Sequence, residues 1–195
     1  MKKTLYLKFL LAYVIFGIFG FIIISVFVPK LTVEQLTREK ANTLYSEATL
    51  IADRYGSGLY TSDTSLESVK NQLDALSVYL DSDIWIINPS GRMVLTTEYP
   101  LNVDEVVIIE NFDPTLTANS YYNVSNFFNY YDEAMLNVIA PITTNYKVNG
   151  YVVIHASMAS VYESSNSLLT ISYITMCILF FLSMIILIFF TEIVY

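Results

Sequence analysis

Two long stretches without Asp, Glu, Lys, Arg or His constrain this sequence more than any other feature. The first covers residues 9–28 and the second covers residues 164–191. A helix of twenty apolar residues spans roughly 30 Å, which is the thickness of the hydrocarbon core of a bilayer. A helix buried in a soluble protein rarely stays uncharged for so long. Residues 9–28 and 168–190 are therefore predicted to be transmembrane helices.

The charges around the first helix indicate whether it is cleaved and which of its ends faces the cytoplasm. Lys2 and Lys3 would also suit a cleaved signal peptide, but the apolar run exceeds the roughly 7 to 15 residues of such a peptide and no A-x-A site follows it. An uncleaved anchor is the favoured interpretation. Since lysines precede this helix and an acidic segment follows it, residues 1–8 are expected in the cytoplasm. The second helix would return residues 191–195 to the cytoplasm, so a multi-pass cell-membrane protein with two spans is expected.

Residues 31–163, between the two helices, form the expected extracytoplasmic domain. They carry 17 acidic and 6 basic residues, a formal charge of −11. Nucleic-acid binding needs clustered Lys and Arg, so that class of partner is excluded. The only cysteine, Cys177, lies in the second apolar stretch, which leaves neither a disulfide framework nor Cys/His metal-ligand spacing. A chain of this length can be held together by a packed core alone.

The first part of this domain is predicted to be helical. Residues 31–55 repeat apolar side chains near the helical period and end at Gly56. A second helix is predicted over 66–79, with Asp63, Thr64 and Ser65 as cap residues. The apolar stripe of the first helix is also expected to offer a two-fold dimer contact, and it consists of Leu31, Leu36, Ala41, Leu44, Ala48, Ile51, Ala52 and Tyr55.

The second part is predicted to be a sheet. Residues 84–87 and 92–97 are apolar runs separated by Asn-Pro-Ser-Gly, the composition of a tight turn. Three further strands are predicted over 121–128, 134–142 and 146–157, the last with a glycine that suggests a bulge. The secondary structure of the connection 98–120 is the hardest to predict from the sequence. The predicted fold class is α+β, with a five-stranded antiparallel sheet and a long N-terminal helix.

Two segments carry a resemblance to a known family. They are IWIINPSGRMVLTT (84–97), with its hydrophobic strand and N-P-x-G turn, and LNVIAPITTNYKVNGYVVIHASMASV (136–161), with Ala-Pro-Ile before a Gly-containing strand. Both resemble signature stretches of extracytoplasmic PAS-like sensor domains of the Cache type. With a membrane helix on each side, the chain resembles the N-terminal input half of a bacterial sensor histidine kinase of a two-component system.

This resemblance implies signal input rather than catalysis. It places the kinase, and any response-regulator contact, in an output region for which residues 191–195 would be the start. It implies membrane lipid and a second copy of the chain as partners, no cofactor, and an unknown small-molecule, peptide or ion as stimulus. Two alternatives stay open: the input module of a chemoreceptor or cyclic-dinucleotide enzyme, and a membrane-anchored scaffold or adhesion module that transmits nothing.

Five residues are candidates for ligand binding. His155 titrates near neutrality, which suits a ligand or pH-sensing role, although a lone histidine in a strand is more often structural. Arg92 follows the turn and can hold an anion through its fork of donors, against the simpler role of a solvated charge. Tyr121, Tyr122 and Phe128 flank the place where this type of fold often has its pocket, and they can stack on a small organic ligand or pack in the core.

Other chemistry finds little support in the sequence. Asp81 with Asp83, and Asp132 with Glu133, lack the D-x-D-x-D-G spacing of a calcium loop, so no metal ligands are assigned. With one histidine in the chain, a catalytic triad has no material, and no catalytic residue is assigned. Trp85 alternates with isoleucines on a strand and is expected in the core.

Overall fold

The computed structural model describes residues 2–56, 58–59, 65–100, 107–114 and 121–194. Its contacts divide the chain into two compact units. The first, called here the helix-pair unit, consists of Met1–Leu36 with Ser160–Tyr195. The second, called the sheet unit, is Thr37–Ala159.

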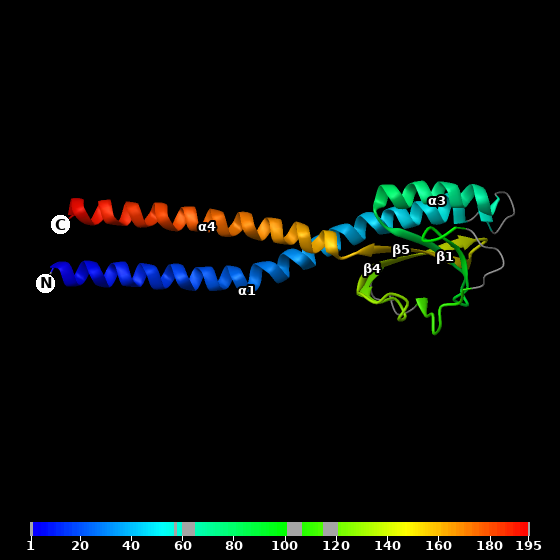
Figure 1. The fold of residues 1–195 in the computed structure, drawn as a ribbon, viewed down its shortest axis with the longest axis horizontal. Coiled ribbons are helices and arrows are strands. Elements are labelled where there is room, and N and C mark those ends of the chain that lie inside the picture. The colour runs from blue at the N-terminus through cyan, green and yellow to red at the C-terminus, as the bar shows by residue number, and fades with distance from the viewer. Residues whose placement is uncertain (1, 57, 60–64, 101–106, 115–120, 195) are drawn as a thin grey trace. The chain divides into compact units, whose positions relative to one another are not determined.

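The helix-pair unit is built from α1 (Lys2–Ile51) and α4 (Ala159–Val194). The spans Leu7–Tyr55 and Ala159–Phe190 are long and apolar enough to cross a membrane, and their most apolar windows are not buried by the rest of the protein. Within this unit the two helices run antiparallel, so the first turn of α1 and the last turn of α4 lie at the same end (Figure 1). This arrangement is consistent with two membrane spans.

Small and aromatic residues bring the two apolar helices together. The ring of Tyr13 stacks on Phe180 with 5.1 Å between centroids, and its hydroxyl donates to the Phe180 carbonyl oxygen at 2.9 Å. The same hydroxyl contacts the Ser183 hydroxyl. A Cβ at Gly17 would collide with the Phe180 ring, so glycine is needed where α1 approaches α4. Close packing and hydrogen bonds between helices are the interactions that hold apolar helices together in lipid.

Helix α1 continues through Pro29, where the sequence pattern suggests a break between a membrane helix and a second helix from Leu31. Proline inside a helix removes one backbone hydrogen bond, and its ring crowds the preceding turn. Prolines are tolerated in apolar helices because neighbouring helices, Ser and Thr side chains, waters and small local adjustments satisfy the freed backbone groups.

The sheet unit contains α3 (Leu66–Leu80) and five strands in the order β2-β1-β5-β4-β3, with every neighbouring pair antiparallel. The predicted α+β class and five-stranded antiparallel sheet are confirmed. A π-helical turn, η1 (Ala52–Gly56), follows α1. The strands are β1 (Asp83–Ile87), β2 (Met93–Thr96), β3 (Tyr122–Ser125), β4 (Met135–Thr144) and β5 (Lys147–Ser157).

Local chemistry sets the ends of α3 close to the predicted limits. The Ser65 hydroxyl accepts from the Ser68 amide at 3.3 Å, which satisfies one of the free donors of the first turn. At the other end Asp81 adopts the left-handed conformation, φ 50°, which a short polar side chain tolerates. The two other expected cap residues, Asp63 and Thr64, lie outside the described residues.

The predicted turn between β1 and β2 is confirmed in detail. The Asn88 side-chain oxygen accepts from the Ser90 and Arg92 amides at 3.0 and 2.9 Å. Gly91 has φ +83°, and a Cβ there would lie 2.8 Å from the Ile109 carbonyl oxygen, so this position requires glycine.

The turn between β4 and β5 differs from its prediction. The pattern assigns the connection to 143–145, but β4 extends to Thr144, and Asn145 and Tyr146 form the turn with φ values of 53° and 63°. Two consecutive positive φ values follow the twist of the flanking strands, and this continues the pairing to the end of the hairpin. The bulge expected near Gly150 is present as a register shift between Ile142 and Thr143.

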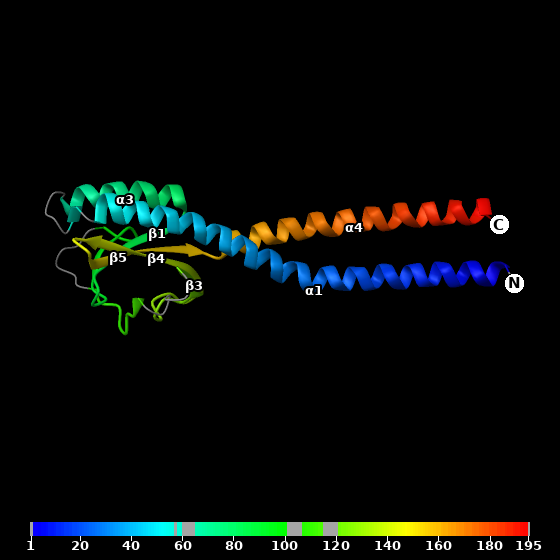
Figure 2. The ribbon, with the colours of Figure 1, turned by 180° about the vertical axis from the view of Figure 1, so that it is seen from behind.

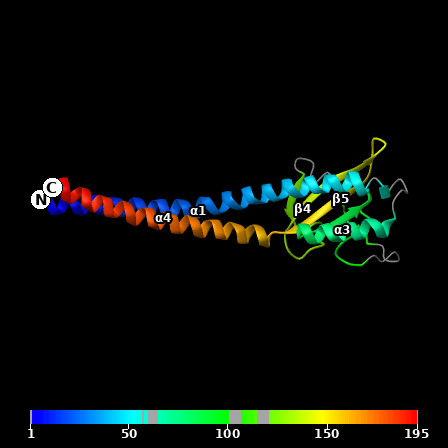
Figure 3. The ribbon, with the colours of Figure 1, turned by 90° about the horizontal axis from the view of Figure 1, so that it is seen from above.

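The sheet presents two different faces. The part of α1 that belongs to the sheet unit, from Thr37 onward, and helix α3 lie side by side over one face, as views from the front, from behind and from above agree (Figures 1, 2 and 3). Every second strand residue faces these helices, including Ile84, Ile86 and Ile154, all fully buried. This is the aliphatic face.

The helix stripe predicted as a dimer contact is used inside the sheet unit instead. Leu44 and Ile51 are 3% and 2% exposed, and Ala41 and Ala48 are fully buried. Only Leu31 in this stripe is largely exposed, at 63%. The stretch from Ala41 to Ile51 packs into the domain's own core and is not free for a second copy.

Candidate functional site

The opposite face of the sheet carries a cluster of aromatic residues. Trp85 and Ile87 project from β1, and neighbouring strands and the loops around Ile109 and Phe127 cover them. We call this cluster the aromatic face. Its members are Trp85, Ile87, Met93, Ile109, Phe112, Phe127, Phe128, Tyr130, Tyr131, Ile139, Tyr151 and Val153.

Trp85, the only tryptophan in the chain, lies at the centre of this face and is fully buried. Its ring meets Phe127 and Tyr130 edge to face, with centroids 5.6 and 4.6 Å away. His155 approaches to 4.3 Å. Edge-to-face pairs of this kind stabilise by about 0.5–1.5 kcal/mol beyond their burial. The expectation that Trp85 belongs to the core is confirmed.

An unusual backbone places several of these rings. Phe127, Phe128 and Asn129 have φ values of 43°, 54° and 62°. Left-handed conformations cost roughly 1–2 kcal/mol for each such residue. Two backbone hydrogen bonds hold the segment, from Tyr130 to the Phe127 carbonyl and from Tyr131 to the Asn126 carbonyl, both 3.1 Å. Backbone strain of this kind concentrates where a fold positions functional side chains.

A buried polar network crosses the aromatic face beneath the rings. The His155 Nδ1 atom lies 2.7 Å from the side-chain oxygen of Asn137. The Asn137 amide nitrogen lies within 3.0–3.1 Å of oxygens of Asn123, Ser125 and Met135. Because that nitrogen can only donate, the Asn137 oxygen accepts, and His155 carries its proton on Nδ1. Its Nε2 atom is consequently a lone-pair acceptor.

His155 is neutral in the folded domain. The side chain is fully buried, and burial lowers its pKa from 6.5 to about 3. Removing water disfavours the charged imidazolium. Titration of His155 in the folded protein therefore falls well below the physiological range. A pH-sensing role near neutrality does not fit this position, and its ligand role stays a prediction.

Three polar atoms of the aromatic face have no hydrogen-bond partner among the described residues. They are Trp85 Nε1, Tyr131 Oη and His155 Nε2. The ring centroids of Tyr131 and His155 are 5.1 Å apart, and those of Trp85 and Tyr131 are 5.8 Å apart. A buried polar group without a partner costs about 1–3 kcal/mol. A polar ligand or an ordered water that reached any of these atoms would supply the missing hydrogen bond.

Two carboxyl groups lie near these rings. The Tyr130 hydroxyl donates to Glu98 Oε2 at 3.1 Å. Burial raises the pKa of Glu98, the Tyr130 hydrogen bond lowers it, and the charge of Asp83 raises it. Burial raises the pKa of Asp83 as well. Burial followed by the nearby carboxylates raises the pKa of Tyr131 far above its ordinary value.

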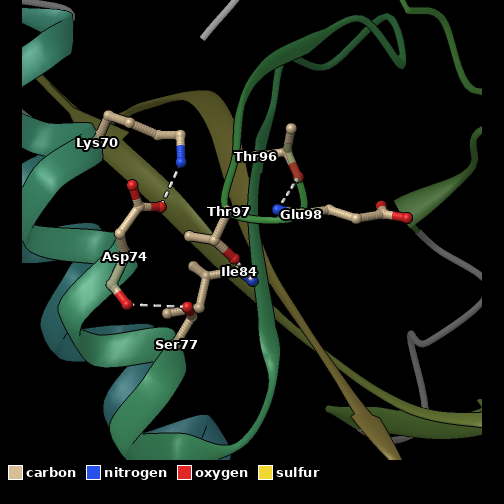
Figure 4. A network of polar contacts seen from close by, with 7 residues as sticks. All are labelled: Lys70, Asp74, Ser77, Ile84, Thr96, Thr97 and Glu98. Carbon is tan, nitrogen blue, oxygen red and sulfur yellow. Dashed lines mark hydrogen bonds and ion pairs between the residues drawn. The ribbon is translucent and has the colours of Figure 1, made fainter. Parts of the chain in front are cut away.

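The polar contacts drawn in Figure 4 fix the strand end that carries Glu98. The Thr96 hydroxyl accepts from the Glu98 amide at 3.1 Å, and the Thr97 hydroxyl accepts from the Ile84 amide at 2.8 Å (Figure 4). On α3, Lys70 pairs with Asp74, and the Ser77 hydroxyl donates to the Asp74 carbonyl at 3.0 Å (Figure 4).

The structure brings only two of the five predicted ligand residues to the aromatic face. Phe128 packs there against Phe112, with centroids 5.7 Å apart, and His155 lies in the network beneath. Arg92 is exposed just after the β1–β2 turn, in an isolated bridge with Ile108.

Tyr121 and Tyr122 belong to a different neighbourhood. The Tyr121 ring lies 4.8 Å from Tyr45 of α1, and its hydroxyl donates to the Asn42 side chain. Tyr122 is half-buried beside Tyr121, with centroids 5.4 Å apart. The five residues do not form one site, and ligand binding by any of them stays a prediction.

Sequence reasoning missed Asn137, the residue that organises the polar network. It stands inside an apolar strand run, Leu136 to Ala140, and is fully buried. A polar amide in an otherwise apolar strand was the available signal, because buried amides need partners. Among the described residues, no three His, Cys, Asp or Glu side chains are grouped closely enough to hold a metal ion.

No family model and no curated protein sequence matches the chain. Solved structures with a similar fold include the sensor domain of the V. cholerae histidine kinase DctB, at 14% identity and a TM-score of 0.47. The match covers 70% of this chain and 57% of that one. Another is the ligand-binding domain of the Campylobacter jejuni chemoreceptor Tlp3 in complex with 4-methylisoleucine, at 13% identity and a TM-score of 0.45.

That second match covers 70% of this chain and 62% of the other. The sensory domain of Tlp3 with isoleucine bound matches at 12% identity and a TM-score of 0.43, over 83% of this chain and 65% of the other. The chain thus spans 57–65% of the length of these three solved chains. Identities this low describe a similarity of fold and carry nothing about ligand or output.

Proposed function

We propose that the chain is the signal-input module of a membrane-bound sensor histidine kinase, with residues 31–163 outside the cytoplasm and both termini inside. The observation that carries this proposal is the insertion of a folded, strongly acidic α+β unit between two membrane-length apolar helices that run antiparallel. The resemblance of residues 84–97 and 136–161 to extracytoplasmic sensor domains supports the same function.

The sheet unit has features expected of a domain that senses a stimulus. Its aromatic face holds buried polar atoms that have no partner among the described residues, so a polar molecule entering there would gain hydrogen bonds with them. β5 ends at Ser157 and α4 begins at Ala159, so a shift of β5 is passed covalently to the second span. Displacements of about 1–2 Å in helices can switch a two-state assembly.

Chemical catalysis does not fit the described residues. His155, the only histidine, bonds Asn137 through Nδ1 and contacts three aromatic rings. It has no serine or cysteine partner in the part of the chain that the structure describes. On this proposal the kinase activity, the response-regulator contact and the homodimer belong to the full receptor.

Topology tests the membrane arrangement directly. Reporters that fold only in the cytoplasm, fused in turn to each end of the full chain, should both be active. A cysteine placed at Ser90, in the exposed turn of a Cys177→Ser chain, should react with a membrane-impermeant maleimide from outside intact cells. An inactive reporter at either end, or a Ser90→Cys variant protected in intact cells but reactive after lysis, would contradict the proposal.

The kind of output is a separate question. A coding sequence that continues beyond Tyr195 into a His-bearing dimerisation helix and an ATP site supports the kinase. A long coiled coil there would support a chemoreceptor, and a stop codon a scaffold or adhesion module. The sensor role itself is tested by screening metabolites, peptides and ions against the full chain in nanodiscs, with the emission of Trp85 as the signal from the aromatic face.

A further inference from the structure

A hollow of about 330 Å³ lies away from the centre of the aromatic face, where the end of α3, the start of β1 and the end of β5 meet. Pockets that hold small molecules begin at about this size. Two apolar side chains, Val78 and Met135, form part of its wall. Its polar wall consists of Ser77, Asp81, Ser82, Asp83, His155 and Ser157.

Two of the three hydroxyl protons of this wall are already in use. Ser77 Oγ donates to the Asp74 carbonyl and Ser82 Oγ donates to the Leu80 carbonyl, both at 3.0 Å. Ser157 Oγ accepts from the Ala159 amide at 3.1 Å. The two donating hydroxyls therefore offer only lone pairs to the hollow. The wall is rich in hydrogen-bond acceptors and poor in donors.

The charges of the wall have one sign. Asp81 is exposed and Asp83 is half-buried, and no ion pair forms to either within the described residues. Burial raises the pKa of Asp83. The hollow also lies at the C-terminus of α3, where the helix dipole is negative and the last turn has no basic residue.

A second observation points to a missing hydrogen-bond donor at the same place. His155 lies directly opposite Asp83 in the β1–β5 pairing, and this fully buried residue is one of those that line the hollow. Its Nδ1 atom is engaged by Asn137, and its Nε2 acceptor has no hydrogen-bond partner among the residues that the structure describes. A buried acceptor beside two carboxylates is matched by a ligand that brings several donors and a positive charge.

We propose that this hollow binds a small organic ammonium ion. The ammonium group lies between Asp81 and Asp83 and donates toward His155 Nε2, while its alkyl part packs on Val78 and Met135. Among the described residues, no three His, Cys, Asp or Glu side chains are close enough to hold a bare metal ion, so the spacing of Asp81, Asp83 and His155 favours a larger group with several donors. The net charge of the surrounding domain raises the local concentration of cations.

The inference names a ligand class for the proposed sensor, and its biological meaning rests on that function. Binding of an ammonium ion in the hollow can be tested whether or not the chain is a sensor. The test uses the full chain in nanodiscs and three probes of matched size and different charge: n-butylammonium, 1-butanol and butyrate. Calorimetric titration gives the dissociation constants, and the emission of Trp85 follows the same titrations. The n-butylammonium ion should bind at least tenfold more tightly than the other two.

Three variants locate the binding. Asp81→Asn keeps a residue that tolerates the left-handed cap, and Asp83→Asn keeps the size of the side chain. Each should weaken n-butylammonium binding about tenfold, as expected for the loss of a charged hydrogen bond. Asp132→Asn, at an exposed position outside the hollow, removes the same charge and should change the dissociation constant less than twofold.

Equal affinities for the three probes, or no binding of n-butylammonium, would overturn the inference. So would an Asp132→Asn variant that loses affinity as much as Asp83→Asn, since that would mean general attraction to an acidic domain. If Asp83→Asn does not fold, Asp81→Asn decides alone. A chain with both termini in the cytoplasm that ignores n-butylammonium would remain a sensor candidate, so the two proposals fail separately.

Discussion

The same strands build two faces of opposite character. On the aliphatic face, Ile84, Ile86 and Ile154 are fully buried under two helices and carry no side-chain polar atom. On the aromatic face, the alternate residues Trp85 and His155 are equally buried, but each has a polar atom without a partner in the described part of the chain. Burial alone therefore does not mark a structural core.

The difference lies in what each face gains from the protein itself. Aliphatic side chains need only contact, which close packing supplies in full. Trp85, Tyr131 and His155 need hydrogen bonds as well, and the protein satisfies His155 at only one of its two nitrogens. A stable fold tolerates such unpaired groups when binding or signalling uses them. The aliphatic face holds the fold, and the aromatic face is the candidate for response.

The largest effect should come from opening a cavity in the aliphatic face. Ile154→Ala should lower the free energy of unfolding by about 3 kcal/mol, because both the burial and the packing of three carbon atoms are lost. Ile154→Val, as the matched control, should cost about 1 kcal/mol. Denaturation of the full chain in detergent, followed by Trp85 emission, measures both. A loss below 1 kcal/mol for Ile154→Ala would remove the claimed contrast.

The polar network should be the next most sensitive point. Asn137→Ala leaves His155 Nδ1 and several oxygens without their partner, and should cost about 2–3 kcal/mol. His155→Phe serves as the second arm of a double-mutant cycle. A coupling energy of about 1 kcal/mol is expected for the hydrogen bond. Additive effects of the two changes would mean that the residues act independently.

Acid should weaken the domain through His155. Its pKa is 6.5 when unfolded and about 3 when folded, so below pH 6.5 the unfolded chain binds a proton that the folded chain refuses. This contribution is complete above pH 6.5 and is lost as the pH falls towards 3. At pH 5 the loss is about 2 kcal/mol.

Denaturation between pH 7 and 5 measures this slope, and His155→Phe should remove it. The raised pKa of Asp83 acts in the opposite direction, since the folded chain then binds the proton more readily. This makes the slope shallower at the acid end. Equal slopes for the wild-type chain and His155→Phe would show that His155 is not the group responsible.

The smallest effect concerns the cover of the aromatic face. Gly91→Ala should cost about 1 kcal/mol, because its φ of +83° is unfavourable for alanine and the added Cβ meets the Ile109 carbonyl. Gly91→Asn eases the backbone penalty but keeps the collision. Trp85 emission shows whether the cover has moved. If Asn restores full stability, backbone strain and not crowding limits this position.

Much of the fold could be predicted from the sequence because many of its elements depend only on residues that are close together in the chain. The apolar runs 9–28 and 168–190, the cap at Ser65 and the Asn88–Gly91 turn each depend on neighbours in the chain. The β4–β5 turn was placed too early because the φ values of Asn145 and Tyr146 depend on strand twist as well as on residue type. The sequence predicted the apolar stripe around Leu44, but it did not predict that this stripe packs inside the sheet unit.

Only some residues of the candidate site could be predicted from the sequence. His155 and Phe128 were singled out for their chemistry, and they do lie at the aromatic face. Tyr121 was grouped with them by its place in the sequence, yet it contacts α1 instead. Asp83 was weighed as part of a metal pair, whereas its partners in space are His155 and the end of α3.

The sequence by itself determined that two apolar helices flank an acidic α+β domain with five antiparallel strands. Period, length and charge decide these features, and each is a property of contiguous residues. Only the tertiary structure decided that Asn137 fixes the proton of His155 and that Asp81, Asp83 and His155 surround one hollow. Those groupings depend on strand register and helix placement, which arise when residues distant in the chain are buried together.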